Sequence, residues 1–191
     1  MIDYEGLLRL TNDYNSRLNR FVSAHELPYT WFEKGQDHVA VKAFKPDDYK
    51  ALVARFEPFS ARIVETEMQG RWIATASLMG KFAIMSSLTV SGGIEIENVE
   101  IMLARPEDQD NGPPRFDHSE IYAPEKMIPV RSVLRRKGLH PDWQGNDAHE
   151  WVSVVFGEYS EEVKFTEKRL SEIVDQELAS GKAKVIYEAD I

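Results

Sequence analysis

The feature that most constrains the fold of this sequence is a succession of patterns that occurs twice. An Asp-His doublet opens a strand-like run at Asp37 and His38, and a second doublet does so at Asp117 and His118. Each run is followed by a proline and a helix-like stretch, and further alternating segments complete each half. Such a repeat indicates one folded unit used twice, with the order strand, helix, strand, strand, strand.

The first half shows this order clearly. Its expected strands share alternating apolar side chains and cover residues 38–44, 61–68, 71–78 and 94–103. The helix is expected to begin at Pro46, because the N–H that proline lacks is not needed in the first turn. Gly70 is expected to supply a positive φ for a tight turn between two strands.

The second half repeats the order with weaker signals. Strands are expected at residues 117–123, 149–157 and 162–165, with a helix-like stretch over 125–138. Residues 139–147 read as irregular, which leaves the second strand of this half the weakest.

Shared details support the duplication. Both halves carry a Gln-Gly pair and a tryptophan before an alternating strand, and Val99 and Val163 hold the same place in the last strand of each half.

Helical segments are expected at both ends of the chain. Apolar residues three or four apart predict an N-terminal helix: Leu7, Leu10, Tyr14, Leu18 and Phe21. Near the C-terminus, Thr166 is a candidate N-cap for a second helix. The final residues read either as an edge strand or as a loose end.

The expected architecture is therefore α+β, a single domain made of two βαβββ modules that form a curved mixed sheet with helical additions. Residues 106–115, rich in Pro, Gly, Asp and Asn, read as the linker between the modules. The expected divisions are a helical extension (1–36), a first module (37–106), a second module (115–167) and a C-terminal helix and tail (168–191).

Composition excludes several classes of function. The net charge is −9 and the pI about 5.1, which argues against a nucleic-acid partner, because such surfaces need clustered Lys and Arg. Residues 133–140 are the one dense basic stretch, and cations there suit the end of a helix. Cysteine is absent, as in many proteins of a reducing compartment. The sequence has neither a signal-peptide pattern nor an apolar run of about 18 residues. We therefore expect a cytoplasmic protein without a membrane partner.

The duplication predicts where the chemistry lies. Two modules related by a pseudo-twofold axis bring equivalent residues to one concave side, so His38 and His118 are expected to share a pocket. Because side chains alternate along a strand, Glu120 is expected on the same side as His118.

The sequence resembles a known superfamily at these positions. The order of elements, the paired strand-opening histidines and the "VEI" strand at residues 99–101 are similar to the vicinal oxygen chelate superfamily, which includes glyoxalase I and the extradiol dioxygenases. More narrowly, the chain resembles the bacterial YecM-like proteins. This second resemblance covers Asp37 to Glu177 and rests on short motifs: "DHVAV", "QGRWI", "DHSEIYAP", "VKF" and "LSEIVDQE".

The resemblance implies a divalent metal ion held by both modules. The strand-opening histidines are His38 and His118, and a carboxylate of the fourth strand corresponds to Glu100. The equivalent residue of the second module is Lys164, a departure from the pattern, because a protonated amine cannot ligate a metal. The remaining two histidines and one carboxylate suit Zn, Fe, Mn or Ni with open positions for a substrate.

Other residues receive roles with alternatives left open. Glu120 is predicted either to replace the missing ligand or to act as a base. Arg71 and Lys164 are predicted to bind a substrate carboxylate, although Lys164 also fits a solvated or ion-paired residue.

Two further assignments compete with these. Glu95 and Glu97 lie on the face opposite Glu100, and a slip of one residue would exchange the two sets. His149 reads as an ordinary turn residue.

These expectations define the function classes. The first is a metal-dependent isomerase, lyase or dioxygenase that acts on a small oxygen-rich molecule. The alternatives are a non-catalytic protein that binds a small ligand on the same fold, and a structural partner protein. The modules are expected to pair within one chain or to exchange in a homodimer.

Overall fold

The fold is described from a computed structural model of the chain. The described residues are 2, 4–31, 36–84, 94–108, 112–123, 127–145, 149–156 and 161–190. Within them, no helix combines the length and the apolar character needed to cross a membrane.

Both βαβββ modules are present. The first comprises β1 (Gln36–Ala43), α2 (Pro46–Phe56), β2 (Ser60–Met68), β3 (Arg71–Ile84) and β4 (Ile94–Leu103). The second comprises β5 (Arg115–Tyr122), α3 (Met127–Arg136), β6 (Asp142–Gly145), β7 (Glu150–Phe156) and β8 (Glu161–Thr166). The terminal elements are α1 (Tyr4–Ala24), α4 (Leu170–Ala179) and β9 (Ala183–Glu188), and short 3-10 turns occupy Tyr29–Trp31 and Glu57–Phe59.

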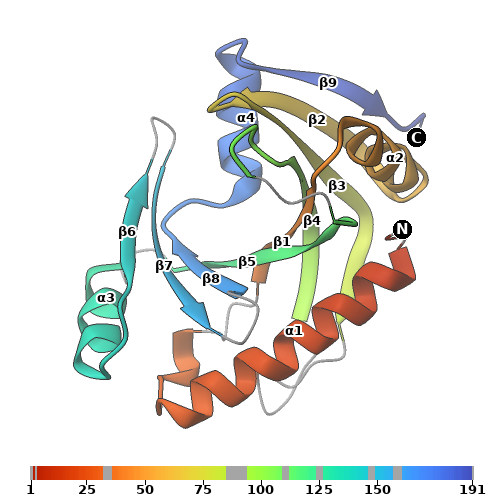
Figure 1. The fold of residues 1–191 in the computed structure, drawn as a ribbon. Coiled ribbons are helices and arrows are strands. Elements are labelled where there is room, and N and C mark those ends of the chain that lie inside the picture. The colour runs from red at the N-terminus through yellow and green to blue at the C-terminus, as the bar shows by residue number, and fades with distance from the viewer. Residues whose placement is uncertain are drawn as a thin grey trace.

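The strands of the described chain form one curved, unclosed nine-stranded sheet in the order β6-β7-β8-β5-β1-β4-β3-β2-β9 (Figure 1). In each module the first and fourth strands are parallel neighbours, β1 beside β4 and β5 beside β8. The modules meet where β1 pairs antiparallel with β5. This confirms the predicted fold class, an α+β domain of two βαβββ modules that form one curved mixed sheet.

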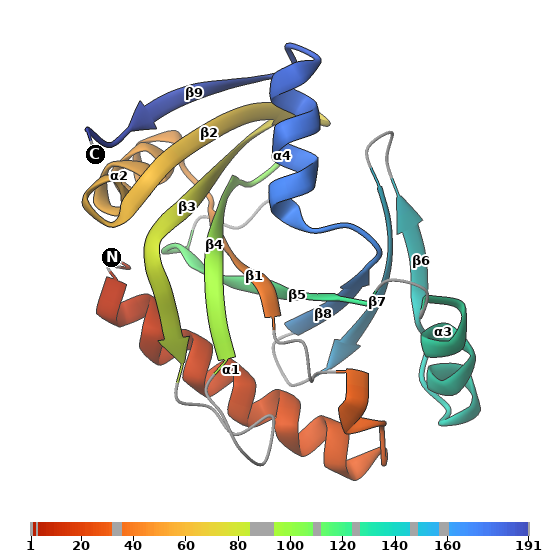
Figure 2. The same cartoon turned by 180° about the vertical axis from the view of Figure 1, so that it is seen from behind.

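The two faces of the sheet have different roles. Apolar residues of α1, α2 and α3 pack on one face and form the main core with alternate strand residues. Helix α4 lies on the other face, where Leu170 and Val174 pack against Val64 of β2 (Figure 2). Because strand side chains alternate, the first face takes the apolar residues and leaves the second for polar chemistry.

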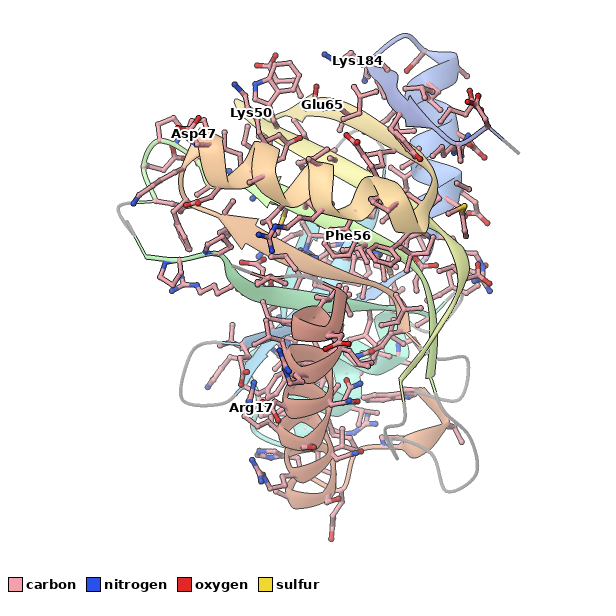
Figure 3. All side chains as sticks on the ribbon, turned by 90° about the vertical axis from the view of Figure 1, so that its right-hand side faces the viewer. Arg17, Asp47, Lys50, Phe56, Glu65 and Lys184 are labelled. Atoms are coloured by element: carbon pink, nitrogen blue, oxygen red, sulfur yellow. The ribbon has the colours of Figure 1, made fainter. Side chains whose placement is uncertain are left out.

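Helix α1 joins the second module to the core by specific contacts. Leu7, Tyr14 and Leu18 are fully buried, which agrees with the predicted apolar stripe. The Tyr14 hydroxyl donates to the backbone oxygen of Glu162 at 2.7 Å. Arg17 of the same helix, labelled in Figure 3, is partly exposed and forms an ion pair with the buried Glu161 of β8.

Some local predictions were confirmed and others were wrong. Gly70 has φ 76° in the β2–β3 turn, as expected. Residues 142–145, read as irregular, form β6 because they pair antiparallel with β7. Thr166 is not an N-cap, since it ends β8 and α4 begins at Leu170.

The C-terminal residues form an edge strand, which decides between the two readings of this segment. Strand β9 pairs antiparallel with β2. At that edge Lys184 lies 3.0 Å from Glu65 (Figure 3).

Candidate metal centre

A cavity of about 440 Å³ lies on the face of the sheet that carries α4. Strands of both modules and α4 line it. Its charged lining residues are His38, Lys42, Arg71, Glu100, Arg105, Asp108, Asp117, Glu120, His149, Glu162, Lys164 and Glu177.

The two strand-opening histidines lie together beside this cavity. The side chains of His38 on β1 and His118 on β5 are buried, with 2% and 1% exposure. Their ring centroids are 5.9 Å apart and the rings are nearly perpendicular, at 77°. The antiparallel pairing of β1 with β5 therefore brings the two imidazoles within reach of a common ion.

A bulge beside each histidine fixes its orientation. The β1–β5 register shifts at Asp37 and again at Asp117, so neither aspartate has a direct partner on the opposite strand. A bulge lets two successive side chains reach the same side of a strand. Asp37 Oδ2 lies 3.2 Å from His38 Nδ1, and Asp117 Oδ2 lies 2.8 Å from His118 Nδ1.

These aspartates were missed as functional residues, although the Asp-His doublet was the signal. When the Nδ1–H of a histidine donates a hydrogen bond to a carboxylate, Nε2 is left as the free ligand atom. Asp37 also accepts a hydrogen bond from the backbone N–H of Leu170 at 2.8 Å. It therefore satisfies the first turn of α4, the role that Thr166 was expected to have.

The carboxylates of Glu120 and Glu100 lie close to the two histidines. Ligand atoms of His38, His118 and Glu120 all lie within 4.8 Å of one another. Glu100 Oε2 is 3.6 Å from His118 Nε2. Glu100 lines the cavity, whereas Glu97 is exposed and is not among the residues that line it. The side chain of Glu95 lies outside the described residues.

The site favours positive charge. Burial by itself lowers the pKa of His38, but Glu120, the hydrogen bond with Asp37 and Glu100 outweigh it and raise this pKa to about 9. Burial pushes the pKa of Glu120 upward, yet His38 and Lys164 outweigh that effect and hold it below its ordinary value. The carboxylates therefore create a field in which a cation is stabilised.

Lys164 stands where the second module would offer its carboxylate. Ala40, two residues after His38, pairs with Glu100, and Glu120, two residues after His118, pairs with Lys164. The Lys164 Nζ is 3.1 Å from His118 Nε2 and 3.8 Å from Glu120 Oε1. The ammonium therefore shares the acceptors that a metal ion would use.

The donor set otherwise fits a divalent metal ion. His38 Nε2 is buried and has no hydrogen-bond partner within the described chain. Imidazole nitrogen and carboxylate oxygen are suitable ligands for Zn, Fe, Mn and Ni. The positive charge of Lys164, close to the ligand atoms of His118 and Glu120, disfavours a metal ion at this position.

Two more residues complete the account of the site. Arg71, predicted to bind substrate, lines the cavity at the start of β3. His149, read as a turn residue, also lines it, and its ring centroid is 5.0 Å from that of Trp151. Burial lowers the pKa of His149. The alternation that begins at His149 was a signal that it shares a face with Trp151.

Comparison with known proteins supports the fold. No protein-family model matches the sequence, and no curated protein matches it significantly. A solved structural genomics protein designated EC4020 aligns over 93% of this chain and 97% of its own, with TM-score 0.59 and 16% identity. At that identity the likeness shows the fold alone.

Two weaker structural similarities carry no argument at their TM-scores. A methylmalonyl-CoA epimerase from Mycobacterium tuberculosis aligns over 69% of this chain and 86% of its own, with TM-score 0.45 and 14% identity. A homoprotocatechuate 2,3-dioxygenase from Arthrobacter globiformis aligns over 74% of this chain and 39% of its own, with TM-score 0.37 and 10% identity. The narrower resemblance to the YecM-like proteins stays a prediction.

Proposed function

We propose that this protein binds one divalent metal ion and uses it to hold a small oxygen-rich molecule, in the manner of the vicinal oxygen chelate superfamily. The observation that carries the proposal is the buried Nε2 of His38, which has no hydrogen-bond partner in the described chain. It lies in a cluster with His118 and Glu120 whose ligand atoms are all within 4.8 Å of one another.

His38, His118 and Glu120 are the proposed ligands. Asp37 and Asp117 are positioning residues that hold each Nδ1 and turn each Nε2 inward. Glu100 is more exposed than Glu120, with side-chain exposures of 14% and 7%. We therefore exchange the roles inferred from the resemblance, so that Glu120 is a ligand and Glu100 accepts a proton from the substrate.

A bound divalent ion would polarise a substrate oxygen and stabilise negative charge that develops on it. The residues around it supply the rest. Glu100 is placed to take a proton from a carbon or hydroxyl next to that oxygen. Leu170, Ile173 and Val174 of helix α4 give the cavity an apolar wall. This combination suits an isomerase, lyase or dioxygenase.

Metal analysis tests this proposal. Protein purified without chelator is measured for stoichiometric Zn, Fe, Mn or Ni, and the affinity of stripped protein for each ion is measured by calorimetry. We expect His38→Ala, His118→Ala and Glu120→Gln to lose the ion, and Glu100→Gln and the control His140→Ala to keep it. Circular dichroism shows that each variant is folded.

Two results would contradict the metal proposal. One is a wild-type protein that binds none of the four ions. The other is retention of a full equivalent by both histidine variants.

The contact of Lys164 with His118 favours a second candidate function, a binding protein without a metal. In that case the Lys164 ammonium is the resident cation of the carboxylate cluster, and it holds an anionic or carbonyl oxygen of the ligand. Thermal stabilisation of metal-free protein by small molecules, unchanged by added metal, distinguishes this candidate from the first.

A further inference from the structure

The cavity holds cations that differ in how they are neutralised. Lys42 Nζ is 2.8 Å from Asp117 Oδ1 and 4.0 Å from Asp108 Oδ2. Lys164 is within 4 Å of both Glu120 and Glu162. Each of these lysines therefore already has carboxylate partners.

Arg71 and Arg105 have no such partner. Both line the cavity, and neither guanidinium forms an ion pair with any described residue. The Nε atoms of both side chains are buried and lack hydrogen-bond partners in the described part of the chain. An unneutralised guanidinium with a buried donor is costly, and a bidentate oxyanion is the ligand that satisfies it best.

The sheet brings the backbone positions of these arginines to the same end of the β3–β4 pair. Arg71 begins β3, and Arg105 follows the end of β4 at Leu103. Strands β3 and β4 are antiparallel, with Ile73 opposite Met102, so the start of one adjoins the end of the other. Gln69, in the turn before β3, accepts a hydrogen bond from Arg105 Nη2 and orients it.

Two other acidic residues that line the cavity, Asp108 and Glu177, form no ion pair with these guanidiniums. Asp108 Oδ2 accepts from the backbone N–H of Arg105 at 3.2 Å and not from its guanidinium. Glu177 of α4 also lines the cavity, and burial raises its pKa. Neither carboxylate neutralises the two arginines.

We propose that Arg71 and Arg105 form an oxyanion subsite for a carboxylate or phosphate group of the small-molecule ligand. This subsite deepens the proposed function and rests on it, because the proposed function assigns the reacting part of the ligand to the histidine cluster. Glu100 pairs with Thr75, four residues along β3 from Arg71, about 13 Å of backbone at the rise of a strand. The ligand is therefore an elongated anion, with its oxyanion at the arginines and its reacting oxygens at the histidines.

The subsite is tested on metal-free protein, so that its outcome does not depend on metal binding. The Nε–Hε resonances of Arg71 and Arg105 are assigned by NMR. Inorganic phosphate and malonate are then titrated separately in EDTA, against sodium chloride of matched ionic strength. The variants are Arg71→Gln and Arg105→Gln, and the control Arg55→Gln removes an equal charge from the exposed face of α2.

We expect saturable shifts of both Nε–Hε resonances with at least one of the two oxyanions. Each cavity variant should weaken that affinity about tenfold or more, as expected for the loss of charge-assisted hydrogen bonds, and the Arg55 variant should leave it unchanged. The tighter anion identifies the chemical class. Amide spectra show whether each variant is folded, and Arg71→Lys, which keeps the charge but loses the bidentate fork, should also weaken binding.

Three outcomes would overturn the subsite. The first is the absence of saturable resonance shifts with either oxyanion. The second is that Arg55→Gln weakens the anion affinity as much as the cavity variants do. The third is that sodium chloride shifts the resonances as much as the oxyanions do. If the oxyanion binds and no metal does, the subsite is supported and the metal proposal is contradicted. If a metal binds and neither oxyanion does, only the subsite is contradicted.

Discussion

Replacing Lys164 by glutamate should strengthen metal binding. The pseudo-twofold register sets Lys164 at the position that Glu100 holds in the first module. The substitution therefore removes a cation from the cluster and supplies the carboxylate that the repeat lacks. The expected product is a site of two histidines with an added carboxylate beside Glu120.

The size of the effect follows from the distances. Lys164 Nζ is 3.1 Å from His118 Nε2 and 3.8 Å from Glu120 Oε1, so an ion on these atoms would lie within about 4 Å of the ammonium, given metal–ligand bonds of about 2 Å. Each unit charge at that separation costs about 4 kcal/mol at an effective dielectric constant of about 20. Most of this is relieved because the lysine can turn toward Glu162 and water. A residual gain of about 1.4–2.8 kcal/mol corresponds to roughly tenfold to hundredfold tighter binding.

Calorimetric titration of stripped protein with Zn(II) and Mn(II) measures this change. Lys164→Met removes the charge without adding a ligand, and its affinity should fall between those of the wild type and Lys164→Glu. Lys50→Glu is the control for overall charge, because Lys50 is exposed on α2 on the other side of the sheet (Figure 3). The reasoning is refuted if Lys164→Glu binds either ion no more tightly than Lys50→Glu does.

Two more predictions concern the first histidine. Asp37→Ala should cost about 1 kcal/mol of stability, because α4 loses its cap. It should also weaken metal binding about tenfold to hundredfold, because His38 loses its positioning partner. Urea unfolding measures the stability and calorimetry the affinity, and an unchanged affinity would contradict the role assigned to Asp37. In metal-free protein the pKa of His38 is raised to about 9, so its stabilising contribution is complete below its unfolded pKa of about 6.5 and is lost as the pH rises through about 9. The shift corresponds to about 3 kcal/mol, and His38→Gln should abolish this part of the pH dependence in unfolding measurements between those pH values.

Much of the architecture could be predicted because it is written in local patterns. Alternation identified the strands around His38 and His118, and apolar spacing identified α1. The repeat then aligned Glu100 with Lys164, and the strand register agrees with that alignment. Short strands with few alternating residues, such as β6, gave no comparable signal because pairing with β7 decides them.

The sequence by itself determined the doubled order of elements and the residue types available to a shared site, since both depend on neighbours along the chain. Only the tertiary structure decided how those residues are used. The bulges at Asp37 and Asp117 arise from pairing between β1 and β5, and the cap of α4 by Asp37 joins residues far apart in sequence. The unneutralised state of Arg71 and Arg105 depends on which carboxylates the fold sends elsewhere, and no local pattern records that.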